Sequence, residues 1–178
     1  MDFFIMRQDA RASNAVKILP DSINPRSLKR EQVESISQTI ILHVAERDNN
    51  AYPDYLETEG MLISEKLKKI MVKYQPDAIF RTIVLIERKI NRQEAYYLIS
   101  PPVIECASSE TAYDMQGNVK EFVLDEVKAG SARVFCDSKC GSKIFVRLDV
   151  AESIMRREPY GVLFERVVTG NRVTSYGL

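Results

Sequence analysis

Three cysteines and one histidine are the residues best suited to chemistry. Cys136 and Cys140 are separated by three residues, a spacing that zinc-ligand pairs tolerate. A closed zinc site needs four ligands, so it would also have to recruit Cys106 and His43, which are far away in sequence. The second closely spaced pair that is typical of zinc knuckles is missing from the sequence. The pattern therefore favours two thiols in an ordinary hairpin turn and predicts no bound metal, with a disulfide across the turn as a further alternative.

Cys106, which is followed by Ala-Ser-Ser, is the candidate for a catalytic thiol. A catalytic cysteine needs a base within hydrogen-bond reach, and only His43 is available. That histidine lies in the apolar run Ile-Leu-His-Val, which favours a partly buried ring bonded to backbone. The sequence contains no G-x-S-x-G, H-E-x-x-H, G-x-x-x-x-G-K-[ST] or G-x-G-x-x-G motif. We therefore expect no catalytic residue and no cofactor; the alternative is a small enzyme or zinc-binding module that uses Cys106, His43, Cys136 and Cys140.

The composition predicts a globular chain whose net charge favours neither nucleic acid nor a membrane surface as a partner. Its 178 residues are 45% hydrophobic, enough for one domain that buries its own core. Twenty-five basic and 25 acidic residues give a formal charge of zero. A nucleic-acid binder or a polybasic membrane-surface protein would need an excess of Lys and Arg, so neither partner is expected.

The compartment is inferred from the N-terminus and the cysteine count. The apolar run at residues 3–6 is too short for a signal peptide, and no run approaches the 18 or so apolar residues of a membrane span. Three cysteines cannot all pair with one another, which fits a reducing compartment. We expect the chain to be cytoplasmic.

The segment that begins at Ser64 has the clearest helical pattern. Ser64 is a suitable N-cap, Glu65 suits the positive end of the helix dipole, and Pro76 ends the helix. Apolar side chains recur on one face, at Ile63, Leu67, Ile70, Met71 and Tyr74. Four lysines, Lys66, Lys68, Lys69 and Lys73, lie on the other faces. A second main helix is expected from Asp149, which has capping-box spacing to Glu152, and a shorter one within residues 28–37.

Short β-branched or apolar runs predict the strands. They lie at residues 3–6, 39–44, 78–87, 95–99, 121–125, 132–135, 143–147 and 161–168. Residues 105–119 are expected to form a loop, and the last ten residues a short strand or an ordered tail. The predicted fold is α+β, an antiparallel or mixed sheet of short strands with two main helices packed on it. Its expected core comprises Ile63, Leu67, Ile70, Met71, Ile83, Leu85, Val134, Phe145, Ile154 and Phe164.

The order of these elements resembles a known family. A tyrosine-containing loop is followed by Met-Leu-Ile-Ser-Glu-Lys-Leu at residues 61–67, which opens a helix. Ile-Glu-Cys-Ala-Ser-Ser-Glu-Thr follows at residues 104–111, and Gly-Val-Leu-Phe closes the pattern at residues 161–164. This arrangement resembles the Imm11, or DUF1629, immunity proteins of bacterial polymorphic toxin systems. We therefore treat residues 1–178 as one domain, with an N-terminal strand and variable segment at 1–49 and a family-like core at 50–168.

The resemblance implies a non-enzymatic immunity protein that binds and neutralises a cognate toxin. The neutral net charge does not favour a basic nuclease as that toxin, although a local acidic patch remains compatible with one. Tyrosine is enriched where binding energy concentrates, so Tyr52 and Tyr55 are the candidate anchors for the partner. The alternative for both is that their rings only cover the edge of the core. A phage-related interaction protein is a third functional hypothesis.

Overall fold

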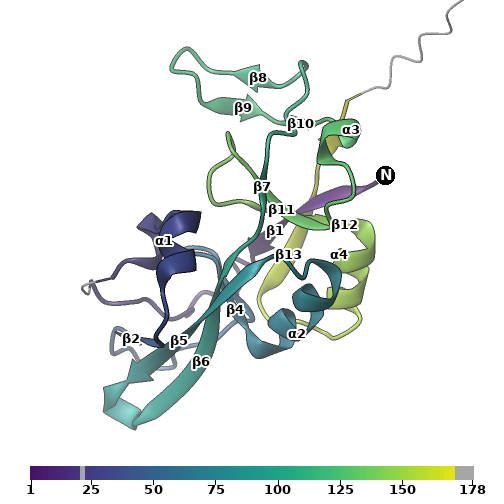
Figure 1. Cartoon of the computed structure of the whole chain (residues 1–178). Coiled ribbons are helices and arrows are strands. Elements are labelled where there is room, and N and C mark those ends of the chain that lie inside the picture. Colours follow the sequence, from purple (N-terminus) through teal and green to yellow (C-terminus); the bar gives the residue numbers. More distant parts are fainter. Residues whose placement is uncertain (21–22, 171–178) are drawn as a thin grey trace, which may run out of the picture.

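The computed structural model describes residues 1–20 and 23–170 of the chain. Two five-stranded sheets form its framework, as Figure 1 shows. The first has the order β13 (Val162–Arg166), β1 (Phe3–Gln8), β12 (Ile144–Arg147), β11 (Val134–Asp137) and β7 (Val103–Ile104). The second has the order β2 (Ile40–His43), β5 (Ile79–Glu87), β6 (Arg92–Ser100), β4 (Leu62–Ser64) and β3 (Tyr55–Leu56).

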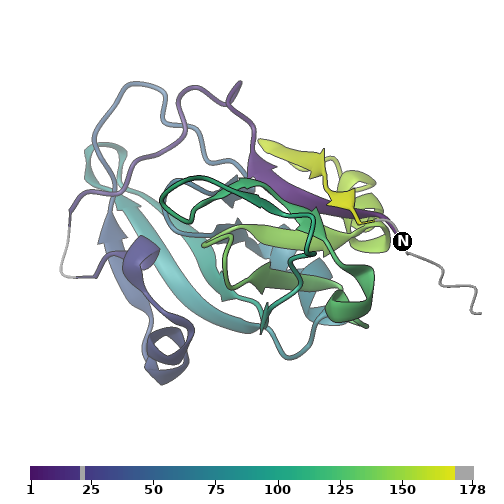
Figure 2. The same ribbon diagram turned by 90° about the horizontal axis from the view of Figure 1, so that it is seen from above.

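Most neighbouring strands are antiparallel, but β7 runs parallel to β11 and β2 runs parallel to β5. Both sheets are therefore mixed. The N-terminal strand β1 lies between β12 and β13, which come from the other end of the chain, and Figure 2 shows it beside the yellow β13. Two short strand pairs complete the β-structure, β10 (Val123–Leu124) with β14 (Val168–Thr169) and β8 (Ala112–Tyr113) with β9 (Val119–Glu121).

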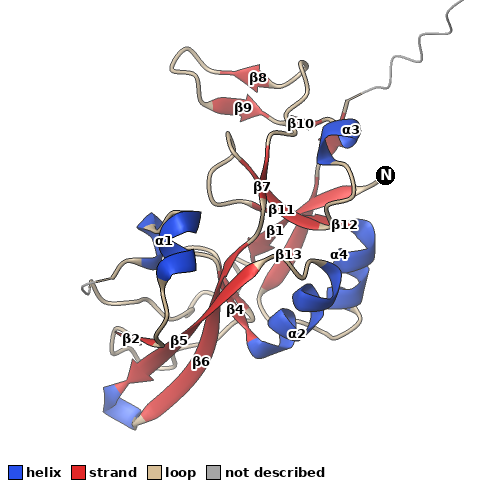
Figure 3. Cartoon of the chain, viewed as in Figure 1, coloured by secondary structure: helices blue, strands red, loops and turns tan. Residues whose placement is uncertain are grey.

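The helices are α1 (Arg30–Ser35), α2 (Glu65–Tyr74), α3 (Glu126–Ala129) and α4 (Leu148–Met155). Single 3₁₀ turns lie at Pro25–Ser27 and Arg88–Ile90. The helices α2 and α4 are the two main ones and pack against each other (Figure 3). The predicted α+β fold is confirmed, with two large mixed sheets where the sequence pattern suggested one.

Alternation along the strands gives each sheet two apolar faces. In β6, Tyr96 and Leu98 point to one core cluster whereas Ile99 points to another. In β12, Ile144 and Phe145 likewise belong to different clusters. Because successive side chains of a strand point to opposite faces, both sheets are covered on each side, and three hydrophobic clusters result.

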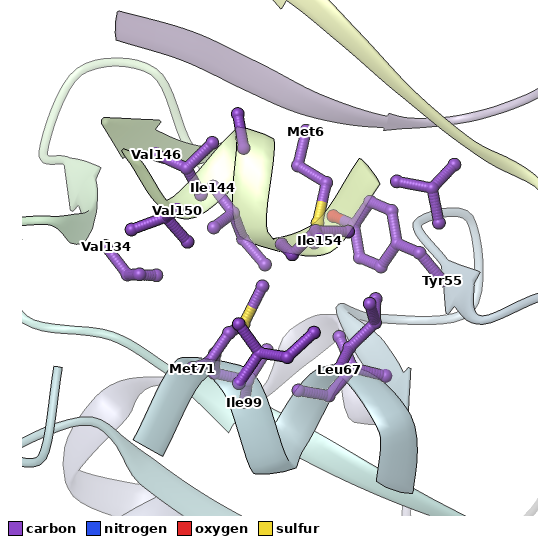
Figure 4. Packing of buried hydrophobic residues seen from close by; sticks show 14 of the residues in the cluster. Met6, Tyr55, Leu67, Met71, Ile99, Val134, Ile144, Val146, Val150 and Ile154 are labelled. Atoms are coloured by element: carbon purple, nitrogen blue, oxygen red, sulfur yellow. The ribbon is translucent and has the colours of Figure 1, made fainter. Parts of the chain in front are cut away.

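The central cluster joins the two sheets through α2 and α4 (Figure 4). Leu67 and Met71 of α2 face Ile154 of α4 across this core, and all three are fully buried or nearly so. Burying one such side chain stabilises the fold by about 1.5–3 kcal/mol. The expected core is buried at Ile63, Leu67, Ile70, Met71, Ile83, Leu85, Val134, Phe145 and Ile154, whereas Phe164 and Tyr74 are only partly buried.

The helix expected from Ser64 is confirmed. The Ser64 hydroxyl accepts a hydrogen bond from the Leu67 amide at 3.4 Å, and the helix ends at Tyr74. The expected cap of α4 is wrong, because this helix already begins at Leu148 and Asp149 is its second residue. The Asp149 carboxylate instead accepts hydrogen bonds from the Arg147 guanidinium at 2.9 and 2.5 Å.

Two strand predictions also change. The expected strand at 121–125 is split, since β9 ends at Glu121 and β10 begins at Val123. The expected loop at 105–119 contains β8 and the start of β9. Of the last ten residues, Thr169 ends β14, and the expectation for residues 171–178 lies outside the described residues.

Candidate partner-binding surface

The three thiols are free and buried. Cys136 lies within β11, not in the turn where the sequence pattern placed it, and Cys140 follows that strand. The Cys106 thiol donates a hydrogen bond to the Asp137 carboxylate at 3.4 Å, and the Cys106 amide donates to the same oxygen at 2.9 Å. These contacts fix the segment around Cys106 to the first sheet.

Burial raises the pKa of all three thiols. It raises the pKa of Cys136 to about 12 and that of Cys140 to about 11. The pKa of Cys106 is raised further still, first by burial and then by the negative charge of Asp137. The thiolate is the nucleophilic form of cysteine, and these raised pKa values favour the protonated thiol near neutral pH.

His43 lies in the other sheet, at the end of β2. It is half buried, as expected, and its Nε2 atom is 3.0 Å from Nη2 of Arg88. A guanidinium only donates hydrogen bonds, so this imidazole nitrogen acts as the acceptor. Within the described residues, no three His, Cys, Asp or Glu side chains come together as metal ligands. The four candidate residues Cys106, His43, Cys136 and Cys140 are thus not brought into one site.

Tyr55 is not at the surface. Its side chain is 0% exposed and lies in the central core beside Met6 and Ile154 (Figure 4). Alternation in β3 explains this position, since Tyr55 points to the central cluster while Leu56 points to the opposite face. The expectation of an exposed Tyr55 anchor is therefore wrong.

Tyr52 is half buried and belongs to a polar cluster at the end of the β5–β6 hairpin. Its hydroxyl donates a hydrogen bond to the Glu87 carboxylate at 2.6 Å, and Nδ2 of Asn50 donates to the other oxygen at 3.0 Å. The Arg92 guanidinium lies over the Tyr52 ring, 4.1 Å from its centre. Burial, followed by the bond to Glu87, raises the pKa of Tyr52. A hollow of about 540 Å³ opens beside this cluster, between Arg47 and Arg92.

Glu87 is the member of this cluster that the sequence analysis did not select. Only 2% of it is exposed. It follows Ile83 and Leu85 at spacings of two along β5, and both of these are buried. The strand period alone therefore places Glu87 on the buried face, where a carboxylate requires hydrogen-bond partners. Tyr52 and Asn50 supply them, so the tyrosine has a structural role at this position.

Comparison with known proteins defines the class to which this chain belongs. The Imm11 model, described as an immunity protein family, matches residues 7–169. The chain is therefore a member of the Imm11 immunity protein family. The match includes residues 7–49 as well as the segment 50–168 that carries the resemblance in sequence. No curated protein matches the chain, and no helix in the described part is long and apolar enough to traverse a membrane.

Proposed function

We propose that this protein is an immunity protein that binds a cognate bacterial toxin and neutralises it without turnover. Membership in the Imm11 family over residues 7–169 is the observation that carries the proposal. The chemistry of the candidate catalytic residues agrees with it, because Cys106 is buried, its pKa is raised, and His43 lies in a different sheet. The toxin protein is the expected partner, and the cytoplasm, where an immunity protein can meet a toxin before it acts, is the expected location.

Co-expression tests this proposal. The partner to use is the toxin domain encoded beside this gene, induced in cells with and without the protein. We expect survival only when this protein is present. A variant in which Leu67 is replaced by Asp should abolish rescue because it unfolds the central core. Cell death in the presence of the folded wild-type protein would contradict the proposal for that toxin.

The enzyme alternative makes a different prediction in the same assay. If Cys106 were catalytic, Cys106→Ala would remove rescue although the protein still folds. If binding is sufficient, Cys106→Ala should rescue as well as the wild type wherever its folded amount is equal. Circular dichroism and the amount of soluble protein provide the control for folding.

Tyr52 as a direct contact with the toxin stays a prediction. The comparison of Tyr52→Ala with Tyr52→Phe tests it, since only the former removes the ring that a partner could contact. Loss of rescue by Tyr52→Ala, with the folded amount unchanged, would support a contact at this end of the molecule.

A further inference from the structure

The β8–β9 hairpin projects from the top of the molecule in Figure 1, away from both large sheets. Its base is pinned at Thr111, a side chain only 6% exposed. The Thr111 hydroxyl donates to the Val123 carbonyl at 3.0 Å and accepts from the Val123 amide at 3.2 Å. These two bonds and the packing of Val119 against the third core cluster hold the hairpin at its root, while residues 112–118 are exposed to solvent. We call residues 105–121 the acidic arm; it comprises the projecting hairpin and the preceding segment, which Cys106 fixes to the first sheet.

The turn at the tip of the arm is fixed by its own hydrogen bonds. Oδ1 of Asp114 accepts from the amides of Gln116 at 2.9 Å and Asn118 at 2.8 Å. The Asp114 amide donates to the Asn118 carbonyl at 2.9 Å, and Gly117 has a φ of 83°, which glycine adopts readily. The tip therefore keeps one conformation without help from a partner, which lowers the entropy cost of binding.

This turn presents an apolar side chain that packs against nothing. Met115 has a relative exposure of 105%, the largest among the exposed apolar residues of the described chain. Tyr113, one position before the turn, is 42% exposed, and Lys139 approaches its ring. Methionine adapts its shape to a partner surface, and tyrosine is enriched at interfaces. Neither residue belongs to a core cluster, so folding does not explain why apolar side chains occupy these positions.

The charge of the arm differs from that of the whole chain. The arm itself carries four carboxylates, Glu105, Glu110, Asp114 and Glu121, and one lysine, Lys120, in a chain whose 25 acidic and 25 basic residues balance. Lys128 and Lys139 contact the arm at the Ala107 carbonyl and the Tyr113 hydroxyl and offset part of this negative charge. All four acidic residues are exposed. In the part of the chain that the structure describes, Glu105, Glu110 and Glu121 form no ion pair with a basic side chain. Their charge is therefore available to a partner.

We propose that the acidic arm is the element that docks on the toxin, with Met115 entering an apolar pocket whose rim is basic. This inference rests on the proposed immunity function and specifies its interface. Charge complementarity determines the chemistry of the partner surface, since exposed carboxylates accelerate encounter with a basic protein and oppose encounter with an acidic one. The apolar tip then supplies contact area that the carboxylates do not. The arm reconciles a neutral chain with a basic toxin, because its negative charge is local.

The apolar contact is tested by Met115→Asp, measured as the dissociation constant of the complex between the full chain and the purified toxin domain. Asp retains the acidic character of the arm, so any weakening reports loss of the apolar contact. We expect affinity to fall at least about tenfold, as for a central interface residue. The matched control is Met155→Asp, at an exposed methionine of α4 (53% exposed), which should change affinity less than about twofold.

The electrostatic contribution is tested by Glu121→Lys, with Glu34→Lys of α1 as the control, since both glutamates are exposed. Glu121→Lys should slow association and reduce its dependence on salt, whereas Glu34→Lys should leave both close to the wild type. Thermal unfolding of all four variants should stay near the wild type, because every substituted side chain is exposed.

The outcomes separate this inference from the function on which it rests. If the wild type binds the toxin and both arm variants bind as tightly, the acidic arm is not the interface although the immunity function stands. Loss of binding in Ile41→Asp alone would place the interface on the exposed outer strand of the second sheet, where Ile41 is 56% exposed. If the wild type fails to bind, the proposed function itself fails for that toxin.

Discussion

At the scale of single residues, burial determines what the cysteine thiols can do. Cys106 is 0% exposed and Cys136 is 6% exposed. The thiolate is the form that attacks alkylating reagents, so a buried thiol with a raised pKa is protected both by its inaccessibility and by its protonation. The same residue types at the surface would be reactive.

We therefore expect iodoacetamide at about pH 8 to modify the native protein far more slowly than the unfolded chain, whose thiols ionise near pH 8.5. Mass spectrometry of the intact protein before and after denaturation measures the difference. Rapid labelling of Cys106 in the native protein would show that this thiol is accessible and ionised, and would restore the enzyme alternative.

The two tyrosines selected from the sequence provide a matched pair. The Tyr55 hydroxyl is buried and has no hydrogen-bond partner within the described residues. A buried hydroxyl that loses its hydrogen bonds to water and gains none in the protein lowers the stability of the fold by about 1–3 kcal/mol. We expect Tyr55→Phe to leave the free energy of unfolding unchanged or to raise it, as measured by urea denaturation. A clear loss of stability would mean that this hydroxyl has a partner.

Tyr52→Phe should have the opposite effect. It removes the 2.6 Å bond to Glu87, a buried carboxylate. Hydrogen bonds to charged groups contribute about 1.5–3 kcal/mol, so the free energy of unfolding should fall by about that amount. The control is Tyr160→Phe, at a tyrosine that is 51% exposed, which should change it by less than about 0.5 kcal/mol. Equal effects of the two substitutions would argue that the Glu87 cluster does not stabilise the fold.

At the scale of elements, the start of α2 links distant segments of the chain. The Ser64 hydroxyl donates to the Asp54 carboxylate at 2.5 Å while it caps the Leu67 amide. The other oxygen of Asp54 accepts from the Tyr160 amide at 2.8 Å and from Lys66 at 3.1 Å. Asp54 thus joins the cap of α2 to the segment that enters β13, and helix position and sheet position are set together.

Leu67→Ala tests the packing that this arrangement creates. Leu67 is 0% exposed in the central cluster, so the substitution should lower the free energy of unfolding by about 2–5 kcal/mol. Val72→Ala on the same helix, at a side chain 41% exposed, should cost less than about 0.5 kcal/mol. If urea denaturation shows that both substitutions lower the free energy of unfolding by the same small amount, α2 does not pack on the core as described.

Sequence patterns predict an element well when it is long enough to show its hydrophobic repeat and when a cap or a proline marks its boundary. The α2 helix has an N-cap at Ser64 and a proline after its end, and β5 and β6 are nine residues each. The strands β3 and β4 are only two and three residues long, too short for a period to appear. Tyr55 was misplaced for this reason, because its direction depends on pairing with β4. The start of α4 was also misplaced, since Arg147 draws the Asp149 carboxylate into an ion pair that local spacing does not reveal.

At the scale of the whole molecule, both sheets bury apolar side chains on their two faces, and the central core ties them together through α2 and α4. The sequence indicated the α+β class but not the division into two sheets. The alternation of apolar side chains along a strand shows which faces are buried, but it does not determine which sheet the strand joins. The acidic arm was missed for a related reason. Its residues were assigned to a loop, and only the fold shows that its hairpin projects and that Glu105, Glu110 and Glu121 form no ion pair within residues 1–20 and 23–170.

The proposed immunity function requires that the chain acts by stoichiometric binding, without turnover. Titration of a fixed amount of active toxin domain with increasing amounts of this protein tests it most directly, with residual toxin activity as the readout. A tight binder should abolish activity at about one chain per toxin, and active toxin should be recovered when the complex is dissociated. Complete inactivation by a small fraction of an equivalent, with toxin that stays inactive after this protein is removed, would show turnover and contradict the account.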